Sequence, residues 1–147
     1  MNRSAKGAAV QTATTVELRI AARAENVALA RLALTGVAAV AGLREDDVAD
    51  LKLAVSEVCT NGVLHAYADG RADGDQIVVI RYTVSDDAVT VEVLDSGIGF
   101  DPDAVLVELG SHESEGHLGL ALARAVTDDL EIETGDAGTK VTFSKRR

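Results

Sequence analysis

The chain has 147 residues, which is enough for one ordinary domain and too few for two. Hydrophobic residues make up 47% of it, so a packed core is expected, whereas the formal net charge of −10 argues against direct binding to a nucleic-acid backbone. The single cysteine, Cys59, excludes an internal disulfide and a thiolate metal cluster.

The N-terminal residues predict no targeting segment. Residues 1–14 are small and polar and lack the apolar core of a secretory signal, so we expect a flexible segment ahead of one domain at 15–147. The longest apolar stretch of helical character, Val27 to Val40, is interrupted by Arg31 and is too short to span a bilayer. We therefore expect a soluble, cytoplasmic protein with no membrane partner.

Hydrophobic periodicity predicts the regular elements. Strands are expected at 16–20, 76–84, 88–94, 130–134 and 139–144. Helices are expected at 25–41, at about 46–67 and at 118–127. The stretch 95–116 is rich in glycine and irregular, and a loop of this length in a small domain is usually functional or disordered. The tail, 145–147, is expected to be a solvated end.

The order of these elements predicts the fold class. Strands joined by hairpins are antiparallel, so two helices followed by a hairpin do not fit an alternating parallel sheet. We expect an α/β (α+β) two-layer sandwich, with a mixed, mostly antiparallel sheet and helices on one face.

The first candidate constellation is Glu57 and Asn61 in the second predicted helix. Residues four apart lie on the same helix face, so a carboxylate and a carboxamide project side by side. A carboxamide oxygen is a hard neutral ligand that suits Mg²⁺, and a carboxylate beside it can take a proton from an attacking hydroxyl. The pair alone is more often a solvated Glu and a capping Asn.

The second candidate, Asp95 followed by Gly97 and Gly99, comes directly after a predicted strand. Glycines let the backbone approach a ligand closely, and the Asp can accept a hydrogen bond from an exocyclic amine such as that of adenine. The motif lacks the third glycine of a dinucleotide fingerprint, and the chain has no phosphate-binding GxxxxGK[ST] loop. A tight turn remains the alternative.

Two further glycine motifs follow. Gly116 to Leu120 reads as a glycine-rich helix entry, which can bind an anion through free N–H groups, while Leu118 and Leu120 would anchor the helix to the core. Gly138-Thr139 enters the last predicted strand and has no meaning alone.

Together, in this order, the motifs resemble those of the GHKL (histidine kinase-like) ATPase superfamily, and within it the stand-alone anti-sigma factor serine/threonine-protein kinases. Leu51 to Tyr67 resembles their N box almost residue for residue. Asp95 to Phe100 resembles the first glycine box, and Gly116 to Asp129 the second with its following helix. The resemblance covers Val16 to Phe143 and implies the Bergerat, or histidine kinase-like ATPase, fold.

The resemblance also implies roles for the site residues. Glu57 would be the catalytic base, and Asn61 would coordinate a Mg²⁺ ion on the phosphates of ATP. Asp95 would bind the adenine amine, with Gly97 and Gly99 shaping that wall of the pocket. Gly116, Leu118 and Gly119 would lie beside the phosphates, and Thr139 would lie near the adenine end.

As a member of that family the protein would act in transcription regulation and stress response. It would bind an alternative sigma factor and phosphorylate a serine of an anti-anti-sigma antagonist, as a homodimer. The loop that would form the ATP lid, 101–115, contains no Lys or Arg. This acidic lid favours an alternative: an anti-sigma binding module with little or no kinase activity. The catalytic domain of a sensor histidine kinase fits less well, because no dimerisation helix with a phosphoacceptor His is present.

Overall fold

The computed structural model describes residues 13–68, 76–96, 115–135 and 137–147. The strands are β1 (Thr14–Ala21), β2 (Ile77–Val84), β3 (Ala88–Asp95), β4 (Asp129–Gly135) and β5 (Gly138–Arg146). The helices are the 3-10 turn η2 (Ala24–Asn26), α1 (Val27–Ala41), α2 (Glu45–Ala68) and α4 (Glu115–Val126). This is the predicted order of strands and helices.

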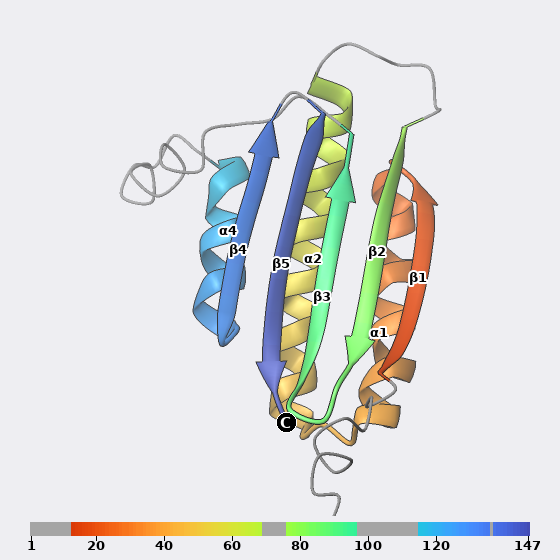
Figure 1. Ribbon diagram of the computed structural model, residues 1–147. Helices are drawn as coiled ribbons and strands as arrows, with labels where there is room; N and C mark the ends of the chain where they lie inside the picture. Colours follow the sequence, from red (N-terminus) through yellow and green to blue (C-terminus); the bar gives the residue numbers. More distant parts are fainter. Residues whose placement is uncertain (1–12, 69–75, 97–114, 136) are drawn as a thin grey trace, which may run out of the picture.

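The five strands form one sheet in the order β1-β2-β3-β5-β4, and each neighbouring pair is antiparallel. Helices α1, α2 and α4 all lie on the same face of this sheet (Figure 1). The predicted two-layer sandwich with helices on one face is confirmed. The described sheet is antiparallel throughout rather than mixed: β2 and β3, and β4 and β5, are consecutive paired strands, whereas α1 and α2 connect β1 to β2 and α4 lies between β3 and β4.

The core lies between the sheet and the helices. Along each strand, alternate residues point to the same face, and the apolar positions of β2, β3 and β5 therefore form one buried surface. Its members are Val78, Ile80, Tyr82, Val89, Val91, Val93, Val141 and Phe143. The Tyr82 hydroxyl donates a hydrogen bond to the carbonyl of Ala30 in α1 at 2.6 Å, so the one polar atom of this large side chain is satisfied.

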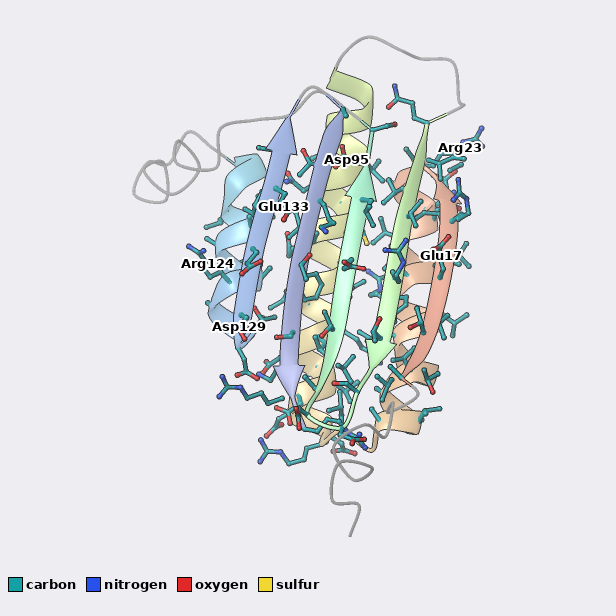
Figure 2. The ribbon with its side chains drawn as sticks, in the orientation of Figure 1. Glu17, Arg23, Asp95, Arg124, Asp129 and Glu133 are labelled. Atoms are coloured by element: carbon teal, nitrogen blue, oxygen red, sulfur yellow. The ribbon has the colours of Figure 1, made fainter. Side chains whose placement is uncertain are left out.

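The opposite face of the sheet carries charges that alternate in sign. Arg81 on β2 lies 3.1 Å from Glu17 on β1 and 3.0 Å from Glu92 on β3. Lys140 on β5 continues the row, 3.8 Å from Glu92 and 3.4 Å from Glu133 on β4. Figure 2 shows Glu17 and Glu133 near the two edges of this face. The face is thus covered by solvated ion pairs, and the apolar surfaces lie on the helix side.

The C-terminal residues are not the solvated end that we expected. Strand β5 continues to Arg146, so Lys145 is held in the sheet. Its ammonium group donates to the Asp50 carboxylate at 2.8 Å and to the Val126 carbonyl at 2.9 Å. The Arg147 guanidinium donates to the carbonyl of Ala41, at the end of α1, at 2.9 Å. The tail therefore connects the sheet to the ends of all three helices.

The 3-10 turn and α1 together form an apolar run, Ala24–Ala41, whose 18 residues and mean hydropathy of 1.3 would be enough to cross a membrane. This run is longer than the Val27 to Val40 stretch because η2 extends it. In the structure its Val27, Ala30 and Leu34 side chains are buried in the core. One face of the run therefore packs in the core, and a second face, which carries Leu29, Leu32 and Val40, is exposed and also apolar.

Candidate functional site

The described residues of the predicted site lie on four elements: α2, α4, β3 and β5. Glu57 and Asn61 lie one turn apart on α2, and α2 packs against both α4 and β3. Asp95 is the last residue of β3, and Figure 2 shows it at the end of that strand beside α2. Gly119 lies within α4, which runs alongside α2 in Figure 1.

Helices α2 and α4 meet closely where Glu57 faces Gly119. A Cβ atom built on Gly119 would overlap the Oε2 atom of Glu57 and would lie 3.4 Å from the Cβ and the Cδ of the same side chain. Gly119 is buried, and the Glu57 side chain is partly buried. The carboxylate of Glu57 therefore occupies the space that a side chain on α4 would otherwise fill.

Asp95 is enclosed by two further glycines. A Cβ on Gly62 of α2 would lie 3.6 Å from Oδ2 of Asp95, which is ordinary van der Waals contact. Gly138, at the start of β5, has a φ of +130° and lies directly against the backbone carbonyl of Asp95. The Asp95 carboxylate thus faces α2 one residue beyond Asn61, while β5 holds its main chain in place.

Asn61 is a buried carboxamide, only 6% exposed. Within the described residues its side chain makes no hydrogen bond, and its amide atoms keep some access to solvent. Such a group fits a ligand that brings its own partner atoms, and the carboxamide oxygen suits Mg²⁺. Within the described ranges no group of three or more His, Cys, Asp or Glu could hold a metal.

Thr139 lies directly opposite Asp95 in the pairing of β5 with β3. Its side chain is 4% exposed, and its hydroxyl shares a hydrogen bond of 3.0 Å with the Thr134 hydroxyl on β4. The structure therefore brings Thr139 beside Asp95, the residue to which the resemblance assigns adenine binding.

Other predicted residues are not brought together in this way. Gly97, Gly99 and the lid stretch up to residue 114 lie outside the described residues. Helix α4 begins at Glu115, so Gly116 lies inside the helix instead of before it, whereas Gly119 lies in the helix as expected. The expectation that Leu118 anchors this helix is wrong, because Leu118 is 57% exposed whereas Leu120 is buried. Residues two apart in a helix differ by about 200° in direction and cannot both face the core.

Sequence reasoning missed Gly62 and the importance of Gly138. A glycine inside a helix costs about 1 kcal/mol relative to alanine, so Gly62 could have been noticed in α2, although an added Cβ there would make only ordinary contacts. The positive φ of Gly138 could not be distinguished from an ordinary hairpin glycine. Both glycines contact Asp95, and both became apparent only from the packing of α2 and β5 on the end of β3.

The thiol of Cys59 takes no part in this site. Cys59 lies between Glu57 and Asn61 in the sequence but points into the core, and burial raises the pKa of its thiol to about 12. A protonated, inaccessible thiol does not act as a nucleophile at neutral pH. The chemistry available at this site is therefore that of the Glu57 carboxylate and the Asn61 carboxamide.

Comparison with known proteins agrees with this geometry. The sequence model of the family described as "Histidine kinase-like ATPase domain" matches residues 20–145. Serine-protein kinase RsbW of Bacillus velezensis is 40% identical to this chain, and the match covers 88% of this chain and 84% of that protein. The same kinase of Bacillus subtilis is 39% identical over the same shares.

Two solved structures have the same fold. The RsbU and RsbW domains of Rv1364c from Mycobacterium tuberculosis match with a TM-score of 0.67 and 25% identity, over 90% of this chain and 32% of that one. The histidine kinase domain of the EL346 blue-light activated kinase from Erythrobacter litoralis matches with a TM-score of 0.54 and 24% identity, over 86% of this chain and 61% of that one. The second likeness concerns the fold alone.

The chain therefore belongs to the histidine kinase-like ATPase family. Within that family it belongs with the anti-sigma factor serine kinases of the RsbW type, as its identity to the Bacillus kinases shows. The enzyme class inferred from the sequence motifs, an ATP-dependent protein serine kinase, is confirmed at this level.

Proposed function

We propose that this chain holds Mg-ATP between α2, α4 and the end of β3, and transfers the γ-phosphoryl group to a serine of an anti-anti-sigma protein. The observation that carries the proposal is the arrangement on α2. The partly buried carboxylate of Glu57 lies one helical turn from the buried carboxamide of Asn61. Asp95, at the end of β3, faces α2 at Gly62, the residue that follows Asn61.

In this proposal Glu57 accepts the proton of the serine hydroxyl as the serine oxygen bonds to the γ-phosphorus and the bond to the β-phosphate oxygen breaks, which leaves ADP. Asn61 would hold a Mg²⁺ ion, which supplies charge neutralisation for the phosphates when bound. Asp95 accepts a hydrogen bond from the adenine amine, with Thr139 beside it. Gly97, Gly99, Gly116, Leu118 and Gly119 complete the binding residues.

The proposed partners are an alternative sigma factor and its anti-anti-sigma antagonist, in the cytoplasm. The similarity to the RsbW kinases supports this assignment. The formal charge of −10 supports protein partners over nucleic acid, because an acidic surface repels a phosphate backbone and attracts basic segments.

We also propose that the protein is a homodimer that associates through α1 and β1. Leu29, Leu32 and Val40 are exposed on α1, and Leu32 and Val40 are 69% and 68% exposed. Beside them, a hollow of about 180 Å³ is lined almost entirely by apolar atoms of α1, β1 and β2. Strand β1 is also an edge strand with one unpaired side. An apolar helix face next to an open strand edge is a typical association surface.

Phosphoryl transfer tests the kinase proposal. Wild type, Glu57→Gln and a control, Glu45→Gln at an exposed position of the same helix, are incubated with Mg-ATP and a purified anti-anti-sigma protein that binds the chain. Phosphoserine should form with wild type and the control, and Glu57→Gln should reduce kcat at least 10²-fold. Two results together would contradict the kinase proposal: wild type forms no phosphoserine, and Glu57→Gln binds and regulates the sigma factor as wild type does. The protein would then be an anti-sigma binding module.

A further inference from the structure

The described helices contain glycines in three different environments. At Gly36 of α1 an added Cβ would meet no atom within 4 Å, and at Gly62 of α2 it would make ordinary contacts of 3.6 to 3.8 Å. At Gly119 of α4 it would overlap the Glu57 carboxylate. Each internal helical glycine costs about 1 kcal/mol relative to alanine. Only at Gly119 does a steric clash explain why alanine is absent.

The crowding at Gly119 cannot be relieved by a shift of α2. The residues that follow Glu57, Val58 and Cys59, are 1% and 0% exposed and anchor this turn of α2 in the core. The backbone of Glu57 is therefore fixed, and a methyl group on residue 119 would have to displace the Glu57 side chain. The added methyl group would overlap only the Oε2 atom of Glu57, since Cβ and Cδ would lie at an ordinary contact distance of 3.4 Å, so the end of the carboxylate would have to turn away.

Nothing else in the described structure positions this carboxylate. Within residues 13–68, 76–96, 115–135 and 137–147, the Glu57 side chain makes no hydrogen bond and no ion pair. The position of the Glu57 carboxylate therefore depends on packing: the turn of α2 that carries it is buried, and Gly119 of α4 leaves space for it.

We infer that Gly119 is a positioning residue, whose missing side chain leaves the space in which the Glu57 carboxylate is held for proton transfer. This inference rests on the proposed role of Glu57 as the base. Helix α4 would thus have two roles: Gly119 leaves space for the Glu57 carboxylate, and the start of the helix makes the phosphate contacts that the resemblance implies.

Gly119→Ala separates this role from a purely structural one. Alanine favours helix, so the variant should fold and unfold at a temperature no lower than wild type. Displacing the base by about 1 Å can cost on the order of 10²-fold in rate. We expect kcat to fall between about tenfold and 10²-fold. Ala125→Ser, at an exposed position of the same helix, is the control and should match wild type.

The rescue variant is Glu57→Asp in the Gly119→Ala background. Asp is one methylene shorter and leaves room for the new methyl group. Each single change should slow transfer, and the double variant should be faster than the product of the two separate effects predicts. The assay uses Mg-ATP and a purified anti-anti-sigma protein that binds the wild-type chain.

The ¹³C chemical shift of the Glu57 carboxyl carbon gives a readout that does not depend on activity. It should differ between wild type and Gly119→Ala without nucleotide, and it should not differ between wild type and Ala125→Ser. Unchanged kcat and an unchanged carboxyl shift in Gly119→Ala would overturn the inference. Loss of ATP binding with an unchanged carboxyl shift would also overturn it, because Gly119 would then act on the nucleotide. If the carboxyl shift changes but Glu57→Gln transfers phosphate like wild type, the proposed role of Glu57 fails while the steric relationship stands.

Discussion

Gly138 lies against the backbone carbonyl of Asp95, at the point where β5 begins beside the end of β3. Its φ of +130° lies in a region that residues with a Cβ rarely adopt, and a Cβ there would overlap the Asp95 oxygen. The glycine therefore lets β5 come close enough to hold Asp95, the residue proposed to bind adenine, at the end of β3.

Replacing Gly138 by Ala should therefore destabilise the protein. We expect a loss of about 1–3 kcal/mol in the free energy of unfolding, from backbone strain and from displacement of Asp95. Urea denaturation of the protein without nucleotide measures it. Gly135 is the matched control, because it pairs with Gly138 across the same hairpin and an added Cβ would meet nothing within 4 Å. A Gly135→Ala variant as unstable as Gly138→Ala would contradict this account.

Asn61→Ala should weaken Mg-ATP binding and leave the fold without nucleotide nearly unchanged. The Asn61 carboxamide has no partner among the described residues, so its removal breaks no internal hydrogen bond. Calorimetric titration with ATP in the presence of Mg²⁺ and thermal unfolding without ATP measure the two effects separately. Equal destabilisation of the empty and ATP-loaded proteins would instead show that Asn61 has a structural role.

Lys145 should stabilise the fold in a pH-dependent way. The hydrogen bond from its ammonium group to Asp50 raises the pKa of Lys145 above its ordinary value, and this effect outweighs the opposing effect of burial. The folded state thus holds the proton more tightly than the unfolded state. The stabilisation is complete below the unfolded pKa, at about pH 10, and is lost as pH rises through the folded pKa.

The variant Lys145→Met should lower the free energy of unfolding at pH 7 by about 1–3 kcal/mol, since Asp50 loses its cation and Asp47 keeps only Arg44. The difference from wild type should shrink above about pH 10. Lys140→Met is the control: Lys140 is also paired but more exposed, so its loss should cost less than about 1 kcal/mol. A difference that grows with rising pH would contradict the assignment.

A charge on the exposed face of α1 should separate the proposed dimer. Val40 is 68% exposed and lines the apolar hollow between α1 and β1. Val40→Glu should convert the dimer to a monomer in sedimentation equilibrium, because a buried unpaired carboxylate costs several kcal/mol. Glu131→Lys, on β4 at the opposite edge of the sheet, should remain dimeric. A wild-type protein that is monomeric at micromolar concentration would refute the proposal.

The fold could be predicted almost completely because it depends on local patterns. Alternation of polar and apolar residues located β1 and β3 within two residues of their ends, and hairpin spacing identified the antiparallel pairing. The start of α4 was placed three residues late, because Gly116 looks like a helix boundary although it lies in the first turn. As a result Leu118 was assigned to the core, and the structure places it on the surface.

The site could be predicted only as a set of residue types. Glu57 and Asn61 share one helix face, which spacing alone reveals. The opposition of Glu57 and Gly119, and that of Asp95 with Gly62 and Gly138, depend on how α4 and β5 pack against α2 and β3. Contacts between elements distant in the sequence leave no periodic signal, so these relationships required the structure.

Binding of Mg-ATP between α2, α4 and the end of β3 is the step on which the proposed kinase activity depends. Isothermal titration calorimetry with ATP, with and without Mg²⁺, on wild type and Asp95→Asn, tests it most directly. The account predicts binding that requires Mg²⁺ in wild type and at least tenfold weaker binding in Asp95→Asn, equivalent to about 1.4 kcal/mol or more. No binding by wild type, or equal binding by the two proteins, would contradict it.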